Sequence, residues 1–204
     1  LKKLELILNK RKLKQQTKSA TVKKILFDVK KYGDKAVIKY EKKFSKIRSG
    51  SNNIKFSKDE INKFSKKIDK DLKKAIDIAY TRIKRFHLKQ TFSAFKYKDK
   101  FNNELSYKYS PIERVGVYVP GGTASYPSTV LMNCIPALVA GVKNIYLTTP
   151  ALGSSVNPAI IYAAKKCGVK EIYKTGGAHS IAALTYGTRT FKKVNKIVGP
   201  GNAF

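Results

Sequence analysis

Four short apolar runs alternate with helical patterns in the second half of the chain, and this alternation limits the possible folds more than any other feature. The runs are Val115–Val119, Ile145–Thr148, Glu171–Lys174 and Lys196–Val198, and the helical patterns cover about 127–140, 156–167 and 178–186. The order β-α-β-α-β-α-β with short links is typical of parallel strands joined by right-handed crossover helices. The sequence therefore predicts an α/β domain with a parallel sheet over residues 111–204.

Glycine-containing turns follow three of these strands. They are Pro120-Gly121-Gly122, Thr175-Gly176-Gly177 and Gly199-Pro200-Gly201. The carboxyl ends of parallel strands meet at one edge of a sheet, so we expect a ligand crevice there, in which backbone N–H groups could bind an anion. Tight strand-to-helix turns alone would also explain the glycines. The dinucleotide fingerprint G-x-G-x-x-G is absent, because Phe204 stands where its last glycine would be, and no P-loop motif occurs.

Residues 1–110 lack the alternation of short apolar runs and helical patterns. They are predicted to form a helical N-terminal region with a short β arm. The spacing of apolar residues predicts helices over 21–32 and 34–45. Ser57 and Glu60 match a capping box that opens a third helix, which we expect to run to about Phe86. Aromatic residues among polar ones over 90–114 indicate short strands in a hairpin or arm.

Lysine and arginine outnumber aspartate and glutamate by 43 to 13, which gives a formal net charge of +30. A balance this basic raises nucleic acid or an anionic surface as a partner. The lysines are spread over whole helix surfaces, however, with no arginine cluster and no stripe interleaved with aromatics. We therefore favour a solvated lysine coat and keep a nucleic-acid-binding module as the alternative. No apolar run reaches the roughly 18 residues of a membrane span, and the first residues do not resemble a signal peptide.

Few side chains could act as bases or metal ligands. His179 follows the second glycine turn at a predicted helix start, where we expect it to face the crevice. His87 ends the long predicted helix, a position more typical of capping or packing. Cys134 and Cys167 lie in apolar helical segments outside any metal-binding spacing, and we expect buried reduced thiols in a cytosolic protein. The residues alone provide neither a zinc site nor a general base.

Long collinear stretches carry a more specific signal than any single turn. They are VGVYVPGGTASYPSTVLMNCIPALVAGV (115–142), AAKKCGVKEIYKTGGAHSIAALTYGT (163–188), VNKIVGPGNAF (194–204), GDKAVIKYEKKFSK (33–46) and the Phe86-His87 pair. Together they resemble the amino-terminal half of the histidinol dehydrogenase family. The resemblance implies an aldehyde-dehydrogenase-like fold with an incomplete Rossmann-like sheet, which would account for the missing fingerprint.

The resemblance also implies an activity. The family oxidises L-histidinol to L-histidine, the last step of histidine biosynthesis, by two NAD-dependent hydride transfers through histidinal. It acts as a zinc-requiring cytoplasmic homodimer. Another aldehyde-dehydrogenase-like NAD oxidoreductase with the same glycine turns is the alternative within this class.

Three positions of this sequence match the family's NAD contacts. They are Tyr118 in the strand before the Pro-Gly-Gly turn, His179 after the second glycine pair, and Asn202 in the Gly-Pro-Gly-Asn turn. One of them departs from the family pattern, because the family usually has glutamine at the position of His179.

The family's zinc ligands and its glutamate–histidine base lie downstream of the Gly-Pro-Gly-Asn turn. No catalytic or metal-binding residue is therefore assigned within this chain. The chain begins with Leu1 instead of Met and ends at Phe204 just after a glycine turn, so we expect a C-terminally truncated fragment. We expect it to be inactive alone, with L-histidinol as the substrate of the complete enzyme.

Overall fold

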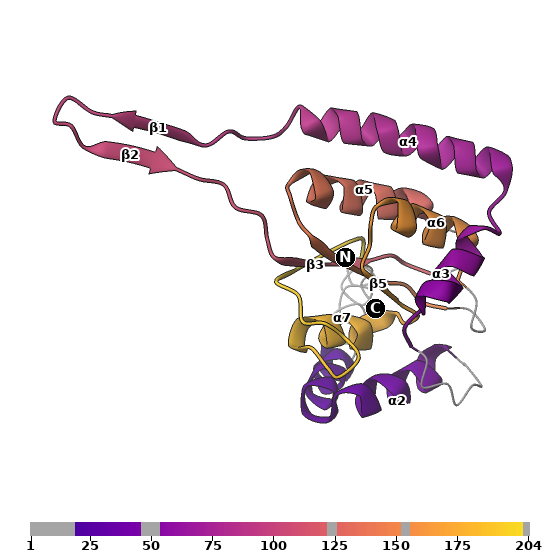
Figure 1. Ribbon diagram of the computed structural model, residues 1–204. Coiled ribbons are helices and arrows are strands. Elements are labelled where there is room, and N and C mark those ends of the chain that lie inside the picture. Colours follow the sequence, from indigo (N-terminus) through magenta and orange to yellow (C-terminus); the bar gives the residue numbers. More distant parts are fainter. Residues whose placement is uncertain (1–18, 46–53, 122–125, 152–155, 202–204) are drawn as a thin grey trace, which may run out of the picture.

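Short parallel strands lie side by side in the middle of the molecule (Figure 1). The computed structural model describes residues 19–45, 54–121, 126–151 and 156–201. The strands of the sheet are β3 (Arg114–Tyr118), β4 (Asn144–Thr148), β5 (Glu171–Tyr173) and β6 (Lys196–Val198), in the spatial order β5-β4-β3-β6. Every neighbouring pair is parallel, so the predicted α/β fold with a parallel sheet is confirmed.

Side chains alternate between the two faces of the sheet, as the two-residue period of a strand requires. Val117, Leu147 and Ile172 are paired neighbours on adjacent strands and belong to one buried cluster. Tyr146 and Tyr173 point to the opposite face and belong to a second cluster. A sheet that is apolar on both faces needs a helical layer on each side.

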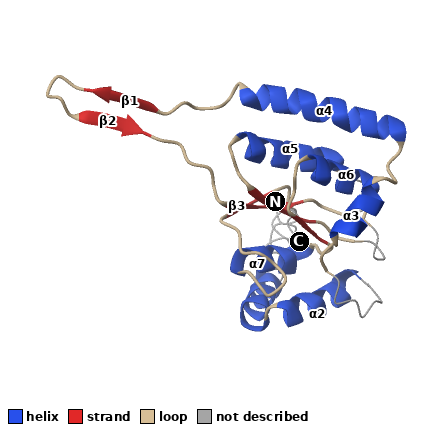
Figure 2. Cartoon of the chain, in the orientation of Figure 1, coloured by secondary structure: helices blue, strands red, loops and turns tan. Residues whose placement is uncertain are grey.

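Helices supply both layers, as Figure 2 shows. One face carries α5 (Pro127–Val139) and α6 (Pro158–Lys166), with α3 (Lys58–Ser65) packed on α6 and α4 (Lys70–Leu88) packed outside α5 and α6. The other face carries α7 (Gly177–Tyr186), with α2 (Asp34–Ser45) and a helix over residues 19–32 beyond it. Both buried clusters draw on residues from before and after position 110, and the domain boundary placed there stays a prediction.

The single helix expected from Ser57 to about Phe86 is wrong, because the structure divides it into α3 and α4. Ser57 and Glu60 form the predicted capping box at the start of α3. Asp69 then has an extended backbone, and its carboxylate accepts hydrogen bonds from the N–H groups of Asp71 and Leu72, which starts α4. The break allows α3 to pack on α6 while α4 turns over α5 and α6.

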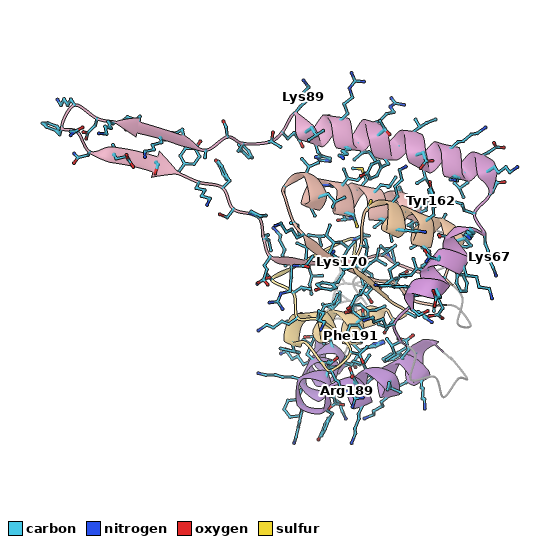
Figure 3. The ribbon with its side chains drawn as sticks, viewed as in Figure 1. Lys67, Lys89, Tyr162, Lys170, Arg189 and Phe191 are labelled. Atoms are coloured by element: carbon cyan, nitrogen blue, oxygen red, sulfur yellow. The ribbon has the colours of Figure 1, made fainter. Side chains whose placement is uncertain are left out.

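Side chains join these helices across the layer. Tyr162 of α6, labelled in Figure 3, donates a hydrogen bond of 2.7 Å to Asp77 of α4. Lys166 of α6 forms a salt bridge of 2.6 Å with the same carboxylate. These contacts, led by the Lys166 hydrogen bond, hold the pKa of Asp77 below its usual range. Burial, together with the hydrogen bond to Asp77, raises the pKa of Tyr162 to about 12.

The arm predicted over 90–114 is confirmed as a hairpin that extends from the body (Figure 1). Its antiparallel strands are β1 (Phe95–Lys98) and β2 (Glu104–Tyr107), and all of their residues are exposed. Asp99 holds the turn through hydrogen bonds from the N–H groups of Phe101 and Asn103.

A short segment before α3 covers the outer edge of β5. The Phe56 N–H donates to the Ile172 carbonyl, and the Lys174 N–H donates to the Ile54 carbonyl, at 2.9 and 2.6 Å. The Lys174 ammonium lies 2.8 Å from Glu60 Oε1. Burial alone would raise the pKa of Glu60, but the hydrogen bonds from Lys174 and Ser57 outweigh it and hold the pKa below its usual range.

The two cysteines are free and buried, as predicted. The side chains of Cys134 and Cys167 are in contact, and their hydrogen bond together with burial raises the pKa of the Cys134 thiol. In the part of the chain that the structure describes, no helix has the length and apolar character needed to cross a bilayer.

The core of the sheet yields a stability prediction. Leu147 of β4 is fully buried, whereas Leu105 of β2 is 43% exposed. Truncating Leu147→Ala removes buried methyl groups and leaves a cavity, so it should lower the free energy of unfolding by about 3 kcal/mol. The matched variant Leu105→Ala should change it by less than about 1 kcal/mol. Urea unfolding followed by circular dichroism would measure both, and equal losses would contradict this placement of the core.

Candidate functional site

The carboxyl ends of the strands meet around the ring of Pro150, which follows β4. A Cβ atom on Gly121 would lie 2.9 Å from Pro150 Cβ, and a Cβ atom on Gly176 would lie 2.2 Å from Pro150 Cγ. Neither position can therefore hold a side chain without movement of the proline. Thr148 strengthens the junction, because its hydroxyl donates a hydrogen bond of 2.6 Å to the Thr175 carbonyl. The turns after β3 and β5 thus pack against the segment after β4.

The turn after β6 joins the same edge. Gly199 has a φ of +136°, and a Cβ atom there would lie 2.2 Å from the Tyr118 carbonyl oxygen. Only glycine fits this backbone and this close approach. The three glycine turns therefore gather at one edge of the sheet, as the parallel topology predicted.

The start of α7 provides hydrogen-bond donors at this edge. Gly176 precedes the helix with an extended backbone, and no side chain caps it. Gly177, the first helical residue, is exposed, and its N–H lies 3.4 Å from the Tyr118 hydroxyl. A helix N-terminus whose first residue is exposed attracts negative charge, because the first N–H groups have no partners within the helix. This arrangement can bind an anionic group next to a phenol that can donate or accept a hydrogen bond.

His179 was expected to face this edge as a cofactor contact, and that role stays a prediction, because the structure shows its side chain buried among residues of α2. Its side chain is only 2% exposed and lies against α2, where its ring is close to those of Tyr40 and Phe44. Its Nε2 atom lies 2.8 Å from Glu41 Oε2. The reason is helix geometry: the face of α7 that bears His179 also bears Ala182 and Ala183, and this face packs on α2.

Tyr118 lies at the end of β3 as predicted, half-buried beside the start of α7. Asn202 lies outside the described residues, so its predicted position next to the other two stays a prediction. The structure brings the Tyr118 hydroxyl to the first N–H of α7 and buries the His179 side chain against α2.

Sequence reasoning missed Glu41, a residue of this region. Glu41 is 6% exposed and accepts hydrogen bonds from both Thr175 and His179. A signal for Glu41 did exist, because it stands four residues after buried Val37 and therefore on the apolar face of α2. Phe44, also on α2, is 50% exposed.

The described residues offer few side chains that could bind a metal ion. No group of three histidine, cysteine, aspartate or glutamate side chains within them could hold a metal ion. His87 has a local partner at the end of α4, where its Nδ1 atom lies 2.7 Å from Gln90 Oε1. The described residues therefore do not fit the zinc ion that the resemblance implies.

Comparisons with known proteins agree on one family. The family model described as histidinol dehydrogenase matches residues 8–204. A histidinol dehydrogenase of Pelagibacter ubique is 53% identical over 203 residues, which cover all of this chain and 46% of that protein. A histidinol dehydrogenase of Sulfurisphaera tokodaii is 48% identical over 185 residues, which cover 90% of this chain and 45% of that protein.

A solved structure gives the same result. The crystal structure of histidinol dehydrogenase from Elizabethkingia anophelis superposes with a TM-score of 0.85 at 42% sequence identity, over 90% of this chain and 42% of that one. The chain thus spans less than half the length of these relatives.

The packing around Pro150 yields a second prediction. Gly176→Ala would push a methyl group into the proline ring and should destabilise the chain by about 2 kcal/mol. Gly201→Ala is the matched control, because its chain neighbours aside, none of the described residues has an atom within 4 Å of the added carbon, and its change should stay within about 0.5 kcal/mol. Thermal unfolding of both variants would check this, and an unchanged midpoint for Gly176→Ala would contradict the close packing of the turns.

Proposed function

The chain belongs to the histidinol dehydrogenase family, and we propose that it is the NAD-side part of an enzyme that oxidises L-histidinol to L-histidine through histidinal. One observation carries the proposal beyond family membership. The exposed start of α7 lies beside the Tyr118 hydroxyl at the carboxyl edge of a parallel sheet, where open α/β sheets bind their ligands. Activity, substrate and cofactor are proposed here for the full-length enzyme, since this chain covers under half of its relatives.

The described residues fit a dinucleotide at this edge. The glycines in these turns have no side chain that would keep a phosphate away from their backbone, and the α7 N-terminus offers N–H donors. The Tyr118 hydroxyl can hydrogen-bond to the same ligand, and its ring can orient it. Asn202 would add an amide from the turn after β6. When bound, NAD supplies the hydride acceptor, and these residues bind it and orient it.

The role of His179 is proposed to be indirect. The family contact expected at this position would need a side chain that reaches the crevice, whereas this side chain lies against α2. His179 would then support the cofactor by holding the first turn of α7.

Zinc and the general base are proposed to come from outside this chain, in the part that only the longer relatives contain. The described residues provide no group of three metal ligands, so no step of the reaction is assigned to a metal held by them.

We further propose that the full-length enzyme is a cytoplasmic homodimer. The hairpin arm supports a partner, because Phe101 is 73% exposed and Tyr97 and Tyr107 are exposed as well. A two-stranded hairpin is marginally stable alone, and exposed apolar patches mark protein contacts. At the base of the arm, Phe92, Tyr109 and Met132 line a groove of about 1110 Å³.

A tyrosine substitution tests the cofactor site. Tyr118→Phe removes the hydroxyl beside Gly177 and should weaken NAD binding by the full-length enzyme about 3- to 10-fold, the value of one neutral hydrogen bond. Tyr107→Phe, which makes the same change on the arm, should leave the Kd unchanged. Calorimetric titration with NAD measures both, and equal Kd values for Tyr118→Phe and the unaltered enzyme would count against the site.

A second test concerns the chain alone. The 204-residue chain should neither oxidise L-histidinol nor retain zinc, because the described residues contain no group of three metal ligands and the base is proposed to lie outside this chain. Metal analysis after dialysis against a weak chelator, with an NADH absorbance assay, measures both properties. One zinc ion retained per chain would contradict the proposal that its ligands lie outside this chain.

A further inference from the structure

Two carboxylates on α2 hold the two ends of α7. Asp34 and Glu41 stand seven residues apart, which places them on one face of α2, two turns from each other. Asp34 accepts hydrogen bonds from Thr188 and Thr190, just after the C-terminus of α7. Glu41 accepts hydrogen bonds from Thr175 and His179, on either side of the α7 N-terminus.

The two bonds to Glu41 share a single oxygen atom. The Thr175 hydroxyl and His179 Nε2 both donate to Oε2. Both donors are buried, at 0% and 2% exposure, so neither can exchange this partner for bulk water. The rings of Tyr40 and Phe44, also on α2, lie close to the imidazole.

Thr175 and His179, the two partners of Glu41, stand on either side of the glycine pair of the proposed cofactor site. Thr175 immediately precedes Gly176, and His179 follows Gly177 by two positions. The His179 ring is near enough that Nδ1 would lie 3.5 Å from a Cβ atom on Gly177. A glycine pair has more backbone freedom than any other dipeptide, so the direction of the Gly177 N–H depends on what fixes its two sides.

We propose that Glu41 is a positioning residue for the cofactor: by holding Thr175 and His179, it aims the first N–H groups of α7 at NAD. The inference rests on the proposed function. The carboxylate does not touch the ligand and acts through the turn. A displacement of a ligand-binding group by about 1 Å is enough to lower binding or rate strongly.

A carboxylate that merely joined two helices would explain the same contacts, and Asp34 provides the comparison. It joins the same two helices and accepts hydrogen bonds from two threonine hydroxyls. These threonines lie at the end of α7 that is away from the crevice. Removing Asp34 should therefore weaken the packing of α7 without redirecting the Gly177 N–H.

The experiment compares three variants of the full-length enzyme. Glu41→Ala should raise the Kd for NAD about tenfold or more. Glu41→Gln should bind within about threefold of the unaltered enzyme, because one amide oxygen can accept both hydrogen bonds that Oε2 accepts. Asp34→Ala should lower the unfolding temperature and leave the Kd for NAD within about twofold. Calorimetric titration well below each unfolding temperature measures the Kd.

A fourth variant covers the case in which Glu41→Ala does not fold. Thr175→Val keeps the shape of the side chain and removes one donor to Glu41, and it should raise the Kd for NAD about threefold. Equal increases for Glu41→Ala and Asp34→Ala, or no increase for either Glu41→Ala or Thr175→Val, would overturn the inference. Failure of the unaltered full-length enzyme to bind NAD would overturn the proposed function itself, and the inference with it.

Discussion

The two apolar faces of the parallel sheet are the constraint on which the rest of the structure depends. Right-handed crossovers place α5 and α6 on one face and leave α7 alone on the other. One ten-residue helix cannot cover that face, so α2 and the helix over residues 19–32 complete the layer. The N-terminal helices are thus part of the same core as the sheet, and the position of α7 depends on its contact with α2.

The fold was predictable wherever one element had a strong pattern of its own. The buried strands have continuous apolar runs, and the turns between them contain glycine. The parallel sheet could therefore be predicted from the sequence alone. The break between α3 and α4 could not be predicted, because the apolar stripe along the predicted helix continues through it. Ile68, within the break, still packs on the core, whereas Leu72 on the same stripe is 41% exposed. Asp69 is a good N-cap, but only packing decides whether a helix restarts there.

The location of the candidate site could be predicted from the sequence, whereas the side chains that point into it could be predicted only in part. Topology alone brings the three glycine turns to one edge, and it brings Tyr118 to the same edge. The direction of His179 depends on which face of α7 packs on α2, a contact between segments more than 130 residues apart in sequence. The spacing of apolar residues within α7 does not indicate that α2 is the helix on which this face packs. Pro150 shows the same limit, because its role depends on two glycines from other turns.

The histidine and the buried glutamate are best understood as one unit. A carboxylate that is 6% exposed is costly to bury unless donors replace its water, and Thr175 and His179 are such donors. A buried imidazole N–H likewise needs an acceptor, which Glu41 supplies. The resemblance implies glutamine where this chain has His179, and an amide at this position would need other hydrogen-bond partners on α2 than an imidazole does. We therefore infer that this departure concerns the support of the glycine turn behind the proposed cofactor, and not a direct contact with the cofactor.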